Sequence, residues 1–187
     1  LQNAPAVTAG PPLAISGITV PAGGSVLLLY EAKTNGYAPP AAGSTITNTA
    51  VITGENLGTP ITTQAVATAE ETLHLSISKG MCPTNVVENG TVTYTFYLQN
   101  SGNTATAAAD YVIVTDTFDP ILSGLTVTLD GAPLTLGTDY TYDTATGAFA
   151  TMAGTITVPA ATAVQDAETG LWRITPGVTK LVITGTV

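Results

Sequence analysis

The segment from Leu73 to Phe118 alternates apolar and polar residues over three stretches, and this alternation is the clearest structural signal in the chain. Side chains along a β-strand point to opposite faces in turn, so each apolar row marks a face turned towards a core. Lys79 follows Ile77 in the first row, and Asp116 follows Val114 in the third. Because unpaired charge is costly to bury, this lysine and this aspartate lead the functional interpretation.

Turn signals rich in Gly, Pro and Asp-Gly divide the rest of the chain into short segments with strand-like composition. Residues Leu1 to Pro12 are expected to form an irregular lead-in. Short strands at this spacing predict an all-β sandwich or barrel. The predicted strands are Ala14–Val20, Ser25–Ala32, Ile46–Ile52, Ile61–Ala69, Leu73–Ser78, Gly90–Gln99, Tyr111–Phe118, Leu125–Leu129, Tyr140–Tyr142, Ala148–Met152, Thr155–Val158, Trp172–Thr175 and Lys180–Val187.

Composition excludes several classes of protein. The chain carries 4 basic and 13 acidic residues, a net charge of -9, which repels phosphate backbones and excludes nucleic-acid binding. The longest apolar run, Val26 to Tyr30, is far short of the roughly 20 residues that cross a bilayer, so no membrane insertion is expected in this fragment. Cys82 is the only cysteine, which excludes an internal disulfide. No signal peptide opens the chain, and Leu1 reads as the cut end of a longer protein.

A weak internal repeat predicts the domain organisation. The segment Ile18–Tyr30 resembles Arg173–Gly185, because each has a strand, a proline, a short turn and a second strand. Aligning the two prolines gives an offset of 155 residues, which places the counterpart of Asn48 near position 203, beyond the last residue. We therefore expect residues 1–72 to be the C-terminal part of one repeat and residues 73–187 to be most of the next.

Several segments resemble the "domain of unknown function 11" repeat of bacterial, mostly Gram-positive, cell-surface proteins: LSISKG, GTVTYTFYLQNSGN, YVIVTDTF, ITVPAGGS and STITNTAVITG. The resemblance implies immunoglobulin-like antiparallel β-sandwich modules in tandem, the first one incomplete, between a wall anchor and an adhesive tip. It implies an extracellular location with adjacent repeats as partners. Related modules often contain a Lys-to-Asn isopeptide crosslink beside an acidic residue, which corresponds here to Lys79, Asn48 and Asp116. The departure from the pattern is that Asn48 belongs to the other repeat.

The chemistry of these three residues supports the same hypothesis. A lysine amine attacks a carboxamide only when neutral, and burial disfavours its charged form. A buried carboxylic acid can then carry protons to the departing ammonia, so the reaction needs neither cofactor nor external enzyme. If Asn48 came from another molecule, a strand-swapped homo-oligomer would result. In the alternative interpretation, Lys79 extends to the rim, Asp116 caps a turn and Asn48 binds a neighbouring backbone.

The function predicted from the sequence is a non-enzymatic spacer module without a catalytic site, cofactor or metal. The first alternative is a module that binds host glycan or protein through the loops Tyr37–Gly43 or Asp139–Gly147, or through Trp172 as a stacking platform. The second is a hydrolase using His74 and Cys82, with nothing in the sequence to orient the histidine. Aspartates that could contribute to a calcium site, but are expected to be solvated turn residues, are Asp110, Asp116, Asp119, Asp139 and Asp143.

Overall fold

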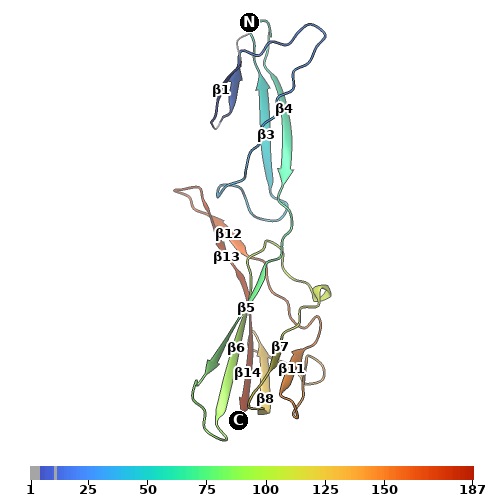
Figure 1. The fold of residues 1–187 in the computed structure, drawn as a ribbon, viewed down its shortest axis with the longest axis vertical. Helices are drawn as coiled ribbons and strands as arrows, with labels where there is room; N and C mark the ends of the chain where they lie inside the picture. The colour runs from blue at the N-terminus through green and yellow to red at the C-terminus, as the bar shows by residue number, and fades with distance from the viewer. Residues whose placement is uncertain (1–4, 11) are drawn as a thin grey trace. The chain divides into compact units, whose positions relative to one another are not determined.

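A computed structural model describes residues 5–10 and 12–187 and shows an all-β chain whose strands pair antiparallel (Figure 1). Within the described residues, the helical structure is the single turn η1 (Ala108–Asp110). The predicted all-β antiparallel class is therefore confirmed. The strands are β1 (Ala6–Thr8), β2 (Ala14–Ser16), β3 (Thr45–Ile52), β4 (Ile61–Thr68), β5 (Leu75–Cys82), β6 (Thr91–Asn100), β7 (Thr115–Thr117), β8 (Ser123–Leu129), β9 (Ala132–Pro133), β10 (Tyr140–Tyr142), β11 (Ala148–Thr151), β12 (Thr162–Gln165), β13 (Trp172–Thr175) and β14 (Gly177–Thr186).

The contacts divide the chain into two compact units, residues 1–34 and 35–187. In the first unit, β1 and β2 form a two-stranded sheet. The second unit contains the hairpin β3–β4 and the sheets that carry the candidate site. The boundary predicted at Thr72 concerns the sequence repeat and stays a prediction.

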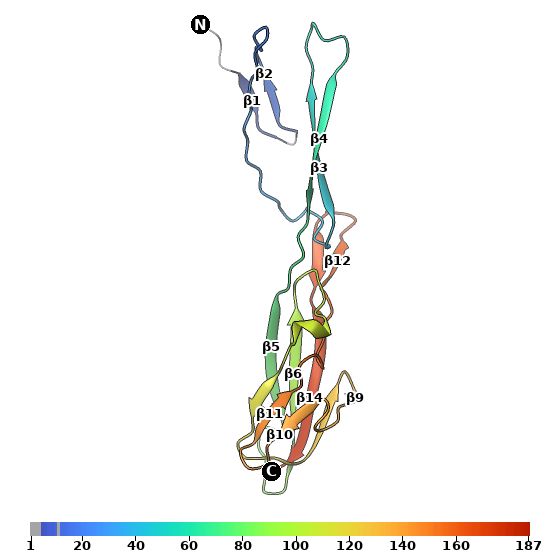
Figure 2. The same cartoon turned by 90° about the vertical axis from the view of Figure 1, so that its right-hand side faces the viewer.

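The largest sheet has the strand order β5-β6-β14-β8-β9 (Figure 2). Its central pair, β6 and β14, stays in register over the full length of both ten-residue strands. On β6, alternate residues from Val92 to Leu98 are buried, and on β14 Leu181 and Ile183 are completely buried. The alternation seen in the sequence therefore gives this sheet one core-facing side.

A smaller sheet, of order β10-β11-β7, contributes to the same core. The Phe118 ring, which follows β7, lies 4.9 Å from the Tyr94 ring of β6, measured between ring centroids. Ile156 and Val158 are completely buried in this core, although their segment forms no strand. The side chains that fill the core thus come from both sheets and from the connection that follows β11.

Asn100, at the end of β6, is completely buried and organises the adjoining loop. Its Oδ1 accepts hydrogen bonds from the backbone N–H groups of His74 (3.3 Å) and Gly102 (2.9 Å). Its Nδ2 donates to the carbonyl oxygen of Thr104 at 2.7 Å. One amide side chain therefore satisfies three backbone groups that a loop would otherwise leave without partners.

Replacing Asn100 with alanine is expected to lower the free energy of unfolding by about 2–3 kcal/mol, because buried backbone groups lose their partners. Chemical denaturation measures this difference. The control is Asn85→Ala in an exposed turn, for which we expect a change within about 0.5 kcal/mol. Equal effects of the two substitutions would contradict the proposed role of Asn100.

Several strand predictions differ from the structure. Ser25–Ala32 is exposed and is not a strand. Tyr111–Phe118 is reduced to β7, because η1 precedes it and Tyr111 has a left-handed φ of 51°. Thr155–Val158 is buried without forming a strand, whereas β12 was missed. The irregular lead-in contains β1; residues 1–4 and 11 lie outside the described residues.

Candidate crosslinking site at Lys79 and Asp116

Lys79 and Asp116 lie on the edge strands of the two sheets that share the core. Lys79 on β5 is paired with Phe96 on β6, and Phe96 is 3% exposed, so both side chains lie on the core-facing side of the larger sheet. Asp116 on β7 is paired with buried Phe149 on β11, which places the carboxylate on the core-facing side of the smaller sheet. The two charged rows predicted from the sequence therefore face each other.

The amine and the carboxylate are in direct contact. The distance from Lys79 Nζ to Asp116 Oδ2 is 2.5 Å, a charge-assisted hydrogen bond. The other carboxylate oxygen, Oδ1, accepts a hydrogen bond from the backbone N–H of Thr117 at 3.0 Å. The backbone of β7 thus holds the Asp116 carboxylate in place, and the carboxylate in turn fixes the position of the Lys79 amine.

Three aromatic rings surround the amine. Lys79 Nζ lies 4.7 Å from the ring centroid of Tyr94, 5.5 Å from that of Phe96 and 5.6 Å from that of Phe118. Cations are attracted to the faces of aromatic rings, and these rings exclude water from one side of the ion pair. Sequence reasoning did not assign them this role, although their places in the apolar rows beside Lys79 and Asp116 were available as a signal.

Lys79 is on the core-facing side of its strand, as its place in the apolar row predicts, but it is only partly buried. Its side chain is 41% exposed, whereas that of Asp116 is 18% exposed. The reason lies in β5, an edge strand whose core-facing side chains are not covered by the smaller sheet. Leu75, Ile77 and Met81, which share that side with Lys79, are 46%, 57% and 39% exposed.

Asn48 lies on β3, in the separate two-stranded sheet β3–β4. It is exposed, as are all residues of β3. It shares one side of β3 with Ile46, Ala50 and Ile52 by the alternation of the strand. The structure therefore brings together the amine and the carboxylate of the predicted crosslink, while the carboxamide lies in another sheet.

The histidine and cysteine do not form a pair. His74 precedes β5 and Cys82 ends it, so eight residue-to-residue steps of extended strand separate them, about 26 Å at the usual rise per residue. In the described part of the chain, no group of three or more His, Cys, Asp or Glu side chains could hold a metal ion. No helix formed by the described residues is long and apolar enough to span a bilayer.

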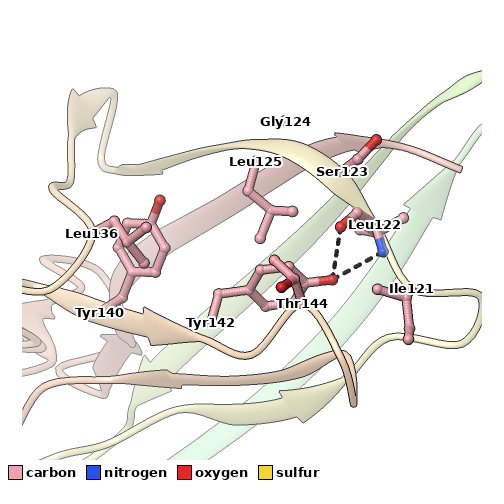
Figure 3. Close-up of a pocket in the computed structure, with 9 residues that line it drawn as sticks. All are labelled: Ile121, Leu122, Ser123, Gly124, Leu125, Leu136, Tyr140, Tyr142 and Thr144. Atoms are coloured by element: carbon pink, nitrogen blue, oxygen red, sulfur yellow. Dashed lines mark hydrogen bonds between the residues drawn. The ribbon is translucent and has the colours of Figure 1, made fainter.

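A cavity of about 360 Å³ opens beside β8 and β10 (Figure 3). Inside it the Tyr142 hydroxyl donates to the carbonyl oxygen of Leu122 and accepts from its N–H, both at 2.9 Å. The lining contains no acid, histidine, cysteine or lysine that could transfer protons or act as a strong nucleophile. It consists of Ile121, Leu122, Ser123, Gly124, Leu125, Leu136, Tyr140, Tyr142 and Thr144.

The carboxylate of Asp143, in one of the predicted binding loops, stabilises its own turn. It accepts hydrogen bonds from the backbone N–H of Ala145 and the hydroxyl of Thr146, both at 2.8 Å. The Ala145 N–H, followed by the Thr146 hydroxyl, holds the pKa of Asp143 below its ordinary value. The carboxylate is therefore committed to the loop conformation.

In comparisons with known proteins, no family model matches the chain, and no match was found among curated proteins or among solved structures. The resemblance found in the sequence therefore stays a prediction, and the geometry of Lys79 and Asp116 carries the functional argument.

Proposed function

We propose that this chain is a structural module of an extracellular bacterial surface protein, a spacer built from immunoglobulin-like β-sandwich repeats. In this proposal, the site at Lys79 and Asp116 forms an amide bond with an asparagine presented by an added strand. The bond would join the edges of the two sheets and resist pulling and proteolysis in a chain that has no disulfide.

The observation that carries the proposal is the contact of 2.5 Å between Lys79 Nζ and Asp116 Oδ2 over three aromatic rings. A surface ion pair contributes little to stability. We therefore attribute the placement of the Lys79 amine, between facing edge strands and beside three aromatic rings, to a chemical role of the site. A strand laid over the pair would remove the remaining water.

The resulting reaction is balanced within the site. The neutral Lys79 amine attacks the carboxamide carbon of an asparagine, the C–N bond to the amide nitrogen breaks, and ammonia leaves. Asp116, which has received the ammonium proton of Lys79, donates a proton to the departing nitrogen and takes up the proton that the attacking nitrogen loses, so it ends as the acid that it was before the attack. One amide is exchanged for another, so neither oxidant nor cofactor is consumed.

The test uses a synthetic peptide of residues 44–53 and the Asn48→Ala chain, which retains Lys79 and Asp116. We expect a covalent adduct whose mass is the sum of the two minus about 17 Da, the mass of the ammonia released. Peptide mapping should place the new bond on Lys79. The control chain combines Asn48→Ala with Lys79→Arg, which keeps the positive charge beside Asp116 but has no nucleophilic amine. An unmodified acceptor chain at saturating peptide would contradict the proposal.

A second candidate function is ligand binding at the loop that begins with Tyr37. The Tyr37 side chain is 57% exposed, and the indole N–H of Trp172 donates to the Tyr37 carbonyl oxygen at 3.3 Å. Gly170 lies against the Tyr37 ring, and this contact keeps Tyr37 and Trp172 on neighbouring surfaces. Aromatic faces at a surface suit sugar rings or protein side chains. Binding to a glycan panel that is lost in Tyr37→Ala would favour this function.

A further inference from the structure

The core-facing side of β5 is an apolar surface that the smaller sheet leaves open. We call it the β5 face and define it by Leu75, Ile77, Lys79 and Met81. Their partners on β6 are Asn100, Leu98, Phe96 and Tyr94, all buried. On the core-facing side of the larger sheet, the side chains of β6 are therefore covered, whereas those of β5 are exposed. This difference shows where the smaller sheet ends.

The smaller sheet ends at β7, which pairs only with β11 among the described strands. The backbone groups of Val114 and Phe118 point towards β11. The Thr151 N–H donates to the Val114 carbonyl oxygen, and the Phe118 N–H donates to the Gly147 carbonyl oxygen. In an antiparallel pair, every second residue turns its backbone groups to the opposite edge. Thr115 and the carbonyl of Thr117 therefore present backbone groups to the free edge of β7, beside Asp116, while the Thr117 N–H is bound by the Asp116 carboxylate. A strand added there would continue the smaller sheet over the β5 face.

The hairpin β3–β4 carries a surface of the complementary kind. We call it the hairpin face: Ile46, Asn48, Ala50 and Ile52 of β3, which are paired with Ala67, Ala65, Thr63 and Ile61 of β4. Every residue of both strands is exposed, and a two-stranded hairpin is at best marginally stable by itself. Neither strand contains a charged residue, so the hairpin can be covered without burying an unpaired charge.

The two faces match position by position. The β5 face is an apolar row interrupted by one amine, and the β3 row is an apolar row interrupted by one carboxamide. If Asn48 lies opposite Lys79 and the two strands run parallel, Ile46 lies opposite Ile77 and Ala50 opposite Met81. If they run antiparallel, the two pairings are exchanged. The apolar side chains therefore cover one another in either direction, and Asn48 meets the ion pair.

We propose that the hairpin of one copy of this chain adds to the β7 edge of a second copy, with its Asn48 placed against the Lys79 and Asp116 of that second copy. This inference rests on the proposed function and names the donor of the asparagine. Amide formation then joins the two copies covalently with loss of ammonia. Because each copy has one donor strand and one acceptor edge, the exchange closes at two copies when it is reciprocal and gives longer chains when it runs head-to-tail. Wild-type chains are expected to form covalent dimers or larger covalent oligomers.

The test mixes two full-length variants that cannot crosslink alone. The acceptor chain is Asn48→Ala, and the donor chain is Lys79→Arg. The mixture is kept near 0.15 M salt, where a Debye length of about 8 Å screens the net charge of -9 on each copy. We expect a covalent heterodimer at the summed mass minus about 17 Da, with Lys79 joined to Asn48, and only monomers from either variant alone. Circular dichroism checks that both variants are folded.

The outcomes separate this inference from the proposed function. If the acceptor chain reacts with the peptide of residues 44–53 but not with the donor chain, the site is reactive and the second copy is not its partner. A wild-type monomer that has lost about 17 Da without any covalent oligomer would place the bond within one copy and would also overturn the inference. Failure of both the peptide and the donor chain to react would overturn the proposed function as well.

Discussion

Replacing Asp116 with asparagine is expected to slow amide formation at Lys79 by at least about 100-fold, because general acid–base catalysis by a positioned carboxyl group typically contributes that much or more. Asparagine keeps the shape and the hydrogen-bonding capacity towards the amine but cannot take its proton. The rate is measured by mass spectrometry as conversion of the Asn48→Ala chain by the peptide of residues 44–53.

The matched control is Asp119→Asn, which removes the same charge from an exposed position three residues further along. It should react at the rate of its parent chain, since Asp119 lies outside the ion pair. Binding of the peptide should persist in Asp116→Asn, because apolar and backbone contacts hold the strand. Equal rates for Asp116→Asn and its parent would show that the carboxylate does not act in the reaction.

Replacing Phe118 with alanine is expected to lower the free energy of unfolding by about 3–5 kcal/mol, the usual cost of removing a buried phenyl ring from a close-packed core. Phe118 is 2% exposed. Its ring lies 4.9 Å from that of Tyr94 and 6.2 Å from those of Tyr142 and Phe149, between centroids, so its loss removes contacts to both sheets. Denaturant unfolding followed by tyrosine fluorescence gives the difference.

The comparison for this core substitution is Val178→Ala, on the exposed side of β14, where the side chain is 43% exposed. A surface truncation of this kind should change the free energy of unfolding by no more than about 0.5 kcal/mol. If Phe118→Ala cost less than about 1 kcal/mol, the ring would not join the two sheets as the structure indicates.

The candidate site combines features that sequence reasoning found with features that it could not find. Lys79 and Asp116 were visible because each interrupts an apolar row, which is a local property of a strand. Their contact was a hypothesis, since nothing local fixes which strands of two sheets face each other. The exposure of Lys79 and Asn48 could not be predicted from the sequence, because alternation shows which side of a strand faces a core but not whether another layer covers it.

The strands show the same division. β13 begins and ends where its pattern predicted, at Trp172 and Thr175, because alternation and flanking turns are local. Ser25–Ala32 has equally good strand composition and forms no strand, because a strand needs a partner for its backbone groups. Ile156 and Val158 are buried without being a strand, because burial depends on where the connection crosses the core.

The sequence by itself determined that this chain is built of β-strands and that a lysine and an aspartate interrupt their apolar rows. Both follow from the period of two residues that an extended backbone imposes on its side chains. Only the tertiary structure decided that Lys79 meets Asp116, that β5 and β7 are edges, and that the β5 face is left open. Those facts depend on which strands pair and which layers overlap, and distant segments settle both through long-range packing.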